Sequence, residues 1–146
     1  MEKLELEPDN FRIDYRGWKE ITINDKKYLV NPQGDIYQII GGEADGEQLF
    51  TWHAAMRETA KVGKRMPTDE EFSKILKTKA DMPNLVLAGY RHTNGSFFIR
   101  GAFAYFWSST ESGATAWTRN LISADATVYR NAGDKAYGFS VRCLKN

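Results

Sequence analysis

The residue types that most often carry out catalysis or hold metals are scarce in this chain. Its 146 residues include one cysteine, Cys143, and two histidines, His53 and His92. A single cysteine can form neither an intramolecular disulfide nor a cysteine-rich zinc site, and two histidines cannot form a histidine cluster. We therefore expect no metal, no cofactor and no enzymatic activity, and we interpret Cys143 as a buried thiol that packs as a small hydrophobic residue.

Two acidic segments could in principle perform acid–base chemistry or bind calcium. Asp69, Glu70 and Glu71 follow Thr68 where a helix is predicted to begin, so they suit the helix dipole and complete a capping box. Residues 7–10 (EPDN) resemble a lectin calcium motif only superficially, because calcium needs about six to eight oxygens gathered from several places. We interpret the first segment as a helix cap and the second as a solvated turn.

Composition and charge exclude several other classes. The chain is 42% hydrophobic and carries 20 basic and 19 acidic residues, which predicts a folded domain without the basic footprint of a nucleic-acid-binding protein. Residues 1–10 are charged and contain no apolar run, so we expect no signal peptide. No stretch approaches the roughly 20 apolar residues of a membrane helix, so we expect no membrane insertion. A role outside the cell would then require another export route or a place on a virion or surface assembly.

The first half of the chain contains clear signals for local structure. A polar lead-in, residues 1–16, precedes a predicted β-hairpin over residues 21–30 and a turn over residues 31–35. Apolar residues then recur at helical spacing over residues 52–60, and Gly63 follows as a stop signal. A second helix is expected to begin after Thr68 and to bury Phe72, Ile75 and Leu76.

The second half contains signals for short strands. An apolar strand is predicted at residues 85–87, and Asn94-Gly95 predicts a hairpin turn between residues 89–91 and 97–99. Further strands are expected at residues 106–109, 116–121, 126–130 and 138–144. Helices segregated from an antiparallel sheet define an α+β class. We expect one domain over residues 1–146, with a scaffold at 1–88 and a binding face within the strands and loops of 89–146.

Some apolar residues fall where a half-buried strand should be polar. Alternation places Ile122 and Tyr129 on the outward faces of their strands, whereas Phe139, Val141 and Cys143 share an inward face. Tyrosines scattered among small polar residues are typical of a paratope, because Tyr supplies contact area at low entropic cost. Two interpretations remain open here: a recognition surface, or core aromatics whose face is misassigned.

Three motifs in this half resemble known families. Residues 65–72 (RMPTDEEF) resemble a motif of the formylglycine-generating-enzyme branch of the C-type lectin fold. Residues 106–111 (FWSSTE), Ala116-Trp117 and residues 138–143 (GFSVRC) resemble the major paralogous domain named after Fibrobacter. The resemblance implies a C-type-lectin-like fold. It does not extend to catalysis, which in the enzyme branch requires paired cysteines, or to the calcium motifs of sugar-binding lectins.

A narrower resemblance is to the variable proteins of diversity-generating retroelements, which share this fold. In those proteins asparagine codons are randomised at their first two bases, and such codons reach many residue types but not Trp, Lys, Glu, Gln or Met. Motifs such as residues 106–111 and 138–145 would form the constant frame. The resemblance implies that the positions between them are variable and contact a ligand. These positions are His92, Thr93, Phe98, Ile99, Ala102, Phe103, Tyr105, Gly113, Ala114, Thr115, Thr118, Ile122, Ala124, Asp125, Thr127, Tyr129, Ala132, Gly133, Asp134, Ala136 and Tyr137.

Within the frame, Trp107 and Trp117 are expected to be buried and to hold the loops through indole N–H bonds to the backbone. Arg142 is expected to be structural and to pair with Glu111. The implied partner is a variable target, either a protein or a cell-surface receptor, of a viral or microbial protein. Two alternatives stay open: a surface-binding or adhesin-like module of the Fibrobacter family that is not diversified, and a relic or regulator of the enzyme branch.

Overall fold

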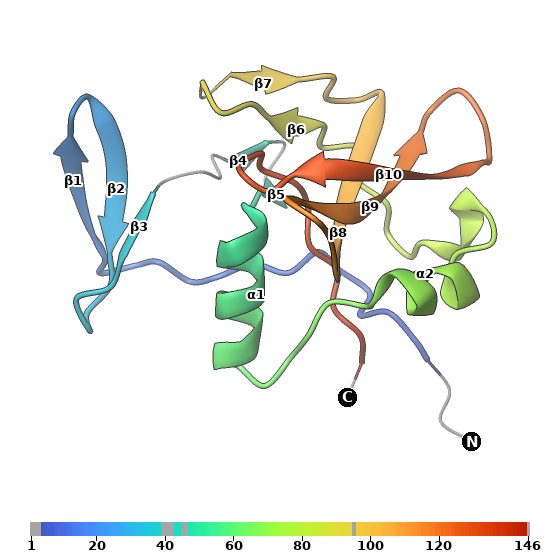
Figure 1. Cartoon of the computed structure of the whole chain (residues 1–146), viewed down its shortest axis with the longest axis horizontal. Coiled ribbons are helices and arrows are strands. Elements are labelled where there is room, and N and C mark those ends of the chain that lie inside the picture. Colours follow the sequence, from blue (N-terminus) through green and yellow to red (C-terminus); the bar gives the residue numbers. More distant parts are fainter. Residues whose placement is uncertain (1–3, 39–42, 45–46, 95, 146) are drawn as a thin grey trace.

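A computed structural model describes residues 4–38, 43–44, 47–94 and 96–145, and within them two α-helices accompany four small antiparallel sheets. This arrangement is α+β, as the order of the sequence signals predicted. A three-stranded sheet near the N-terminus stands at one end of the molecule, and the sheet of the C-terminal half lies at the other, with helix α1 between them (Figure 1). The chain's two ends lie close together, since Leu6 bridges Leu144.

The N-terminal sheet contains β1 (Lys19–Ile23), β2 (Lys26–Val30) and β3 (Ile36–Gln38). Asn24 and Asp25 connect the first two strands with φ angles of 51° and 64°. Positive φ at both central residues is the requirement of a tight hairpin turn, and Asn and Asp tolerate it better than other side-chain-bearing residues. The predicted hairpin is confirmed. A second small sheet pairs β4 (Glu43–Ala44) with β5 (Glu47–Gln48).

Both predicted helices are present. Helix α1 (Trp52–Lys61) ends before Gly63, whose φ of +71° closes the helix. Helix α2 (Asp69–Ile75) begins with a complete capping box, in which the backbone N–H of Glu71 donates to the Thr68 hydroxyl and the Glu71 carboxylate accepts from the Thr68 N–H. A short 3₁₀ helix, η1 (Lys79–Asp81), follows. No helix among the described residues is long and apolar enough to cross a membrane.

The C-terminal half is built on the sheet of β8 (Phe103–Ser112), β9 (Thr115–Ile122) and β10 (Val128–Asp134), with β9 in the centre. A smaller hairpin pairs β6 (Tyr90–Arg91) with β7 (Phe97–Phe98). The strands flanking the predicted Asn94-Gly95 turn therefore pair as expected, although Gly95 itself lies outside the described residues.

The segment over residues 138–144 differs from its prediction. It makes isolated bridges rather than a regular strand, and Ser140 and Arg142, which alternate with the predicted inward residues, are fully buried as well. The N-terminal segment covers it, because Phe11 N–H donates to the Val141 carbonyl at 2.7 Å and Glu7 N–H to the Cys143 carbonyl at 2.8 Å. Leu6, Asn10 and Phe11 are buried, so this part of the predicted polar lead-in belongs to the core. Residues 7–10 are correspondingly not a simple solvated turn, since Asn10 is buried.

Two other expectations about the frame are wrong. Residues 85–87 form no strand but a half-buried connection that leads into β6. Arg142 does not pair with Glu111, because the guanidinium points instead to Asn10 and to backbone carbonyls such as that of Pro83, at 2.6 Å. Glu111 pairs with Lys135, which also lies over the Trp52 ring.

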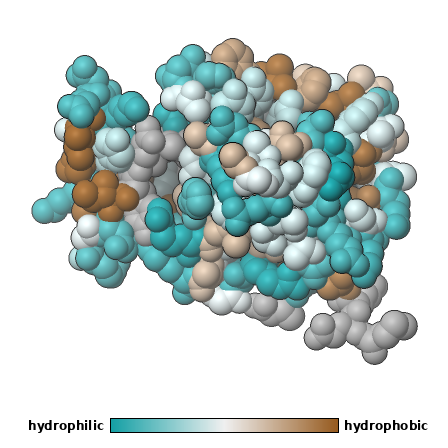
Figure 2. Space-filling model, in the orientation of Figure 1, coloured by the Kyte–Doolittle hydropathy of each residue, from teal (hydrophilic) through white to brown (hydrophobic). Residues whose placement is uncertain are grey.

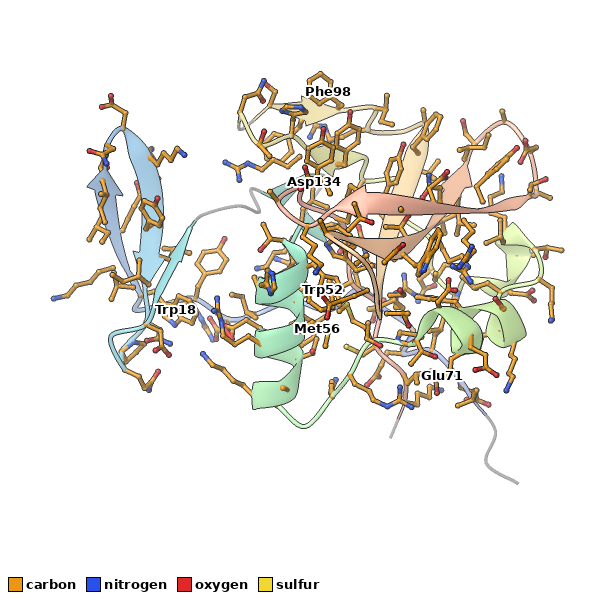
Figure 3. All side chains as sticks on the ribbon, viewed as in Figure 1. Trp18, Trp52, Met56, Glu71, Phe98 and Asp134 are labelled. Atoms are coloured by element: carbon orange, nitrogen blue, oxygen red, sulfur yellow. The ribbon has the colours of Figure 1, made fainter. Side chains whose placement is uncertain are left out.

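The buried core fixes the C-terminal sheet against the helices. Trp107 is fully buried and its indole N–H donates to the Phe50 carbonyl at 2.7 Å, as predicted for a frame tryptophan. Trp117 differs, because it is only half-buried and lies under the Arg130 guanidinium, 3.5 Å from the ring centre. On the same side of β9 as Trp117, and opposite to the face that Trp107 covers, Arg119 is buried and bonds Asp69 at the first turn of α2, at 2.6 Å. The sheet is thus covered on both faces near β9. Figure 3 shows Glu71 on α2 well away from Asp134 and Phe98.

Candidate functional site

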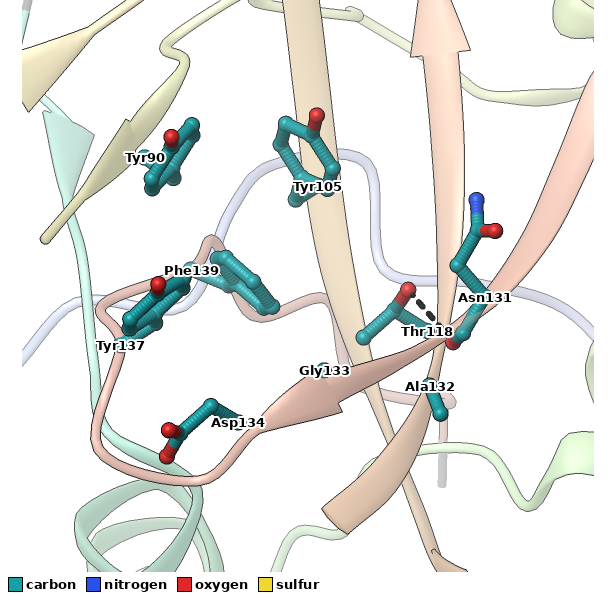
Figure 4. A pocket seen from close by; sticks show the side chains of 9 residues that line it. All are labelled: Tyr90, Tyr105, Thr118, Asn131, Ala132, Gly133, Asp134, Tyr137 and Phe139. Carbon is teal, nitrogen blue, oxygen red and sulfur yellow. Dashed lines mark hydrogen bonds between the residues drawn. The ribbon is translucent and has the colours of Figure 1, made fainter.

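A cavity of about 200 Å³ opens beside β9 and β10 (Figure 4). Six of its nine lining residues are positions that the sequence indicated as ligand-contacting. These six are Tyr105, Thr118, Ala132, Gly133, Asp134 and Tyr137, and the other three are Tyr90, Asn131 and Phe139. The cavity therefore collects residues from β6, β8, β9, β10 and the segment after β10 in one place.

Strand register creates the hollow. Gly133 of β10 pairs with Ala116 of β9, so two of the smallest residues lie side by side at this point of the sheet. Phe139, Thr118 and Trp107 pack over Gly133, and a Cβ atom built there would lie 2.7 Å from the Phe139 ring. Gly133 therefore forms the floor of the cavity, and a larger residue at this position would have to displace the Phe139 ring.

Aromatic rings form one wall of the cavity. Tyr90 and Tyr137 stack with ring centres 5.6 Å apart and an interplanar angle of 15°. Tyr105 and Phe139 stack at 5.0 Å and 19°, and the two pairs stand nearly perpendicular to each other. Edge-to-face and offset contacts of this kind hold rings in fixed orientations. The wall is therefore a preorganised apolar surface.

Three further predicted positions extend this wall over the molecular surface. His92 contacts Tyr137 with ring centres 4.9 Å apart, Phe98 stacks on Tyr90 at 5.5 Å, and Phe103 stacks on Tyr105 at 6.1 Å. Phe98 is 39% exposed, so the wall continues into solvent rather than into the core. We call these seven residues the aromatic wall: Tyr90, His92, Phe98, Phe103, Tyr105, Tyr137 and Phe139.

Polar groups face the aromatic wall across the cavity. The Thr118 hydroxyl donates to the Asn131 carbonyl at 2.9 Å, and the Asp134 carboxylate accepts from the Ala136 N–H at 2.9 Å. Burial raises the pKa of the Tyr105 phenol, and the neighbouring Tyr90 adds to this effect, so the phenol stays neutral. The described residues contain no group of three His, Cys, Asp or Glu side chains that could hold a metal. This arrangement suits stacking and hydrogen bonding.

The remaining predicted positions lie elsewhere in the same half. Gly113, Ala114 and Thr115 form the β8–β9 turn, which adjoins the cavity because Thr115 pairs with Asp134. The positions near the β9–β10 turn lie at the opposite end of the strands, where Tyr129 donates to Asp125 at 2.7 Å. That second group contains Ile122, Ala124, Asp125, Thr127 and Tyr129. Ala136 is exposed beside Asp134, Thr93 is exposed after β6, and Ile99 and Ala102 lie in the β7–β8 connection.

Two of the predicted contact positions are buried rather than exposed. Thr118 is 1% exposed because β9 is the central strand, and Gly133 is buried beneath Phe139. Both still line the cavity from below. Sequence reasoning also missed Tyr90, Asn131 and Phe139. Under the resemblance to retroelement variable proteins, Asn131 carried a usable signal, because an asparagine is the expected residue at a position whose codon has not been altered.

A second cavity of about 380 Å³ lies along the N-terminal segment, between Phe11, Val62 and Cys143. None of the predicted contact positions lines it, and charged residues such as Arg12 and Lys64 surround it. The cavity beside β9 and β10 is therefore the candidate site.

Comparison with known proteins gives one finding. Residues 78–145 match the family model of the Fibrobacter succinogenes major domain. This match supports the Fibrobacter part of the resemblance and spans every residue that lines the candidate site. No curated protein and no solved structure matches the chain significantly.

Proposed function

We propose that this chain is a binding protein of C-type-lectin-like fold that recognises its target through the aromatic wall and the adjoining cavity. One observation carries the proposal. Six of the residues that line the cavity are positions that the sequence predicted to contact a ligand, on the separate ground that they lie between the frame motifs. Small residues such as Ala132 and Gly133 keep the cavity open, and aromatic residues beside it supply contact area.

We further propose that a diversity-generating retroelement varies these positions. The division of labour within the fold supports this idea. Frame residues Phe106, Trp107 and Arg142 are fully buried, whereas Ala132, Asp134 and Phe98 are exposed. Exchanging exposed side chains costs little stability, so such a fold accepts many different binding faces.

Sequencing the encoding gene across its source population tests the diversification directly. We expect substitutions at the predicted positions other than the tightly packed Gly133, concentrated at the first two bases of asparagine-derived codons, and at Asn131 as well. Substitutions spread evenly along residues 90–146, with third-base changes dominating, would refute diversification. They would leave a constant surface-binding module of the Fibrobacter type as the function.

Binding itself can be tested with arrays of glycans and of extracellular receptor proteins. We expect any captured target to be lost in a Tyr137→Ala variant, because Tyr137 contacts both Tyr90 and His92 in the aromatic wall. Tyr15→Ala is the matched control, since Tyr15 is a 37% exposed tyrosine that precedes β1, does not line the cavity and is not one of the predicted contact positions. Equal retention of the target by both variants would place the binding face outside the cavity.

A further inference from the structure

Strand β1 is an edge strand of the N-terminal sheet, whose order is β1-β2-β3 (Figure 1). Ile23 and Lys26 flank the two-residue turn, and the closing residues of such a turn form a hydrogen-bonded pair. Hydrogen-bonded pairs alternate along an antiparallel ladder, so Lys19 and Ile21 also direct their backbone groups toward β2. Glu20 and Thr22 therefore direct their N–H and C=O groups away from the sheet, where no other described segment bonds them.

One face of this sheet carries its exposed apolar residues, with Lys19 and Lys26 at the strand ends. The strand register places Ile21 beside Tyr28, and Val30 beside Ile36, on the same face. Ile23 is 44% exposed and Ile36 is 54% exposed. Figure 2 shows hydrophobic side chains gathered over this end of the molecule, apart from the main body. An open edge next to exposed apolar residues is a surface suited to strand addition.

We propose that two copies of this chain pair through β1, antiparallel, with Ile21 of one copy opposite Ile21 of the other. The two three-stranded sheets then form one continuous sheet of six strands. The N–H and C=O groups of Glu20 bond those of Thr22 in the second copy, and the two-fold axis repeats the exchange. The apolar faces of both sheets lie on the same side and extend each other.

The side chains select this register over its neighbours. The outward backbone groups belong to Glu20 and Thr22, so symmetric pairing can be centred only on Glu20, Ile21 or Thr22. Centring on Glu20 sets two glutamates opposite each other, which is unfavourable. Centring on Thr22 pairs Glu20 with Asn24, whose positive φ places it in the turn and outside the strand. Centring on Ile21 avoids like charges, because Lys19 then lies opposite Ile23 and Glu20 lies opposite Thr22.

The pairing would leave the proposed binding face free. No residue of β1, β2 or β3 lines the cavity beside β9 and β10. A dimer through β1 would therefore present two such cavities, and two linked sites bind a repetitive surface more tightly than one. The dimer does not depend on the proposed function, because a chain with no ligand could form it equally well.

Cysteine crosslinking tests the register. Ile21 would form a pair without mutual hydrogen bonds, whose Cα atoms lie about 4.5 Å apart, within the usual disulfide range. We expect Ile21→Cys to form a covalent dimer on mild oxidation. Glu20→Cys and Thr22→Cys should remain largely monomeric, because each new cysteine would lie two residues along the strand from the same cysteine of the second copy. The native Cys143 is buried and does not interfere. Crosslinking of all three variants to the same extent would overturn the proposed register.

Sedimentation of the full chain tests the pairing itself. We expect wild-type protein to shift from monomer to dimer as its concentration rises, and Thr22→Pro to remain monomeric, because proline removes an outward N–H without touching the β1–β2 ladder. Thr22→Ala keeps that N–H and should dimerise like wild type. A wild-type chain that stays monomeric at every concentration and gives no Ile21→Cys crosslink would overturn the proposal. The crosslinking experiment still tests the proposal if the Thr22→Pro variant does not fold.

Discussion

The Arg142 guanidinium joins the two ends of the chain, since its Nε donates to the Asn10 side-chain oxygen at 2.9 Å across 132 residues of sequence. Its Nη1 atom also lies within bonding distance of the carbonyls of Glu7 and Pro83. Arg142 is fully buried beneath the N-terminal segment. The arginine therefore holds residues 7–10 and the connection after η1 against the last segment of the core.

Replacing Arg142 with methionine should detach this N-terminal segment. The substitution leaves the buried Asn10 side-chain oxygen and several part-buried carbonyls without a donor, so we expect unfolding free energy to fall by about 3 kcal/mol. Hydrogen exchange should speed up at the Glu7 and Phe11 amides, which bond the last segment. Arg16→Met is the control, because Arg16 is 90% exposed and pairs only locally with Asp14. Equal losses in both variants would contradict the role of Arg142.

Glu71 should make the fold sensitive to acid. The hydrogen bond from Arg65, and to a smaller extent that from the Thr68 N–H, lowers the pKa of the Glu71 carboxyl to about 2. Burial acts in the opposite direction and raises this pKa. Because the folded pKa lies below the unfolded one, the stabilisation is complete above about pH 5 and is lost as the pH falls toward 2. We expect Glu71→Gln, which can still cap the helix, to be less stable at pH 7 and to lose less stability between pH 5 and pH 2. Chemical denaturation over this pH range measures the effect.

Glu70→Gln is the control for this measurement, because Glu70 lies on the same turn but is 81% exposed. Its stability should follow the wild-type pH dependence. If Glu71→Gln also follows the wild-type curve, the Arg65–Glu71 pair does not account for acid sensitivity.

The signals that predicted structure correctly were local ones. The capping box of Thr68 and Glu71, and the positive-φ turn at Asn24 and Asp25, depend on residues a few positions apart. Burial of Arg142 depends instead on the N-terminal segment, which the guanidinium bonds from more than 100 residues away. Polar residues in an alternating pattern indicated a solvent-facing side, and only the tertiary fold shows that side to be covered.

The candidate site could be predicted in composition but not in shape. Tyr105 and Tyr137 were identifiable because aromatic residues interrupted a polar, turn-rich sequence. The cavity itself depends on strand register, which sets Gly133 beside Ala116 and packs Thr118 against it. Single-sequence patterns do not determine how two strands align across a hairpin, so the buried floor was unforeseen.

Ile99 has a backbone conformation that does not suit its side chain. Its φ is +54°, a left-handed region that costs a β-branched residue roughly 1–2 kcal/mol relative to residues that tolerate it. We expect Ile99→Asn and Ile99→Gly to raise the midpoint of thermal unfolding. Ile99→Val is the control, since valine is also β-branched and should give no gain. An unchanged midpoint in the asparagine variant would show that no strain is stored at Ile99.

The Cys143 thiol should be nearly unreactive in the folded protein. Burial raises its pKa to about 11, so very little thiolate exists at neutral pH, and access is blocked as well. We expect a disulfide exchange reagent to label the native chain at least ~100-fold more slowly than the unfolded chain. An Ala114→Cys variant offers an exposed thiol on the β8–β9 turn and should react at once. Fast labelling of wild type would mean that the N-terminal segment opens frequently.

In a mutational scan of residues 89–145, the positions that determine stability should differ from those that determine recognition. Substitutions at Ala132, Asp134 and Tyr137 remove exposed or half-buried groups, so we expect each to cost about 1 kcal/mol or less. Phe106→Ala and Trp107→Ala empty fully buried sites and should cost about 3–5 kcal/mol.

Among the cavity residues, Gly133 should be the exception that does not accept substitution at low cost, because any side chain there meets the Phe139 ring at 2.7 Å. Protease resistance of a displayed variant library measures all positions together. We expect Gly133 to tolerate few residues while its neighbours Ala132 and Asp134 tolerate many. If Ala132 and Asp134 proved as intolerant as Trp107, the cavity would be a structural feature of the fold, and a variable recognition face could not be located there.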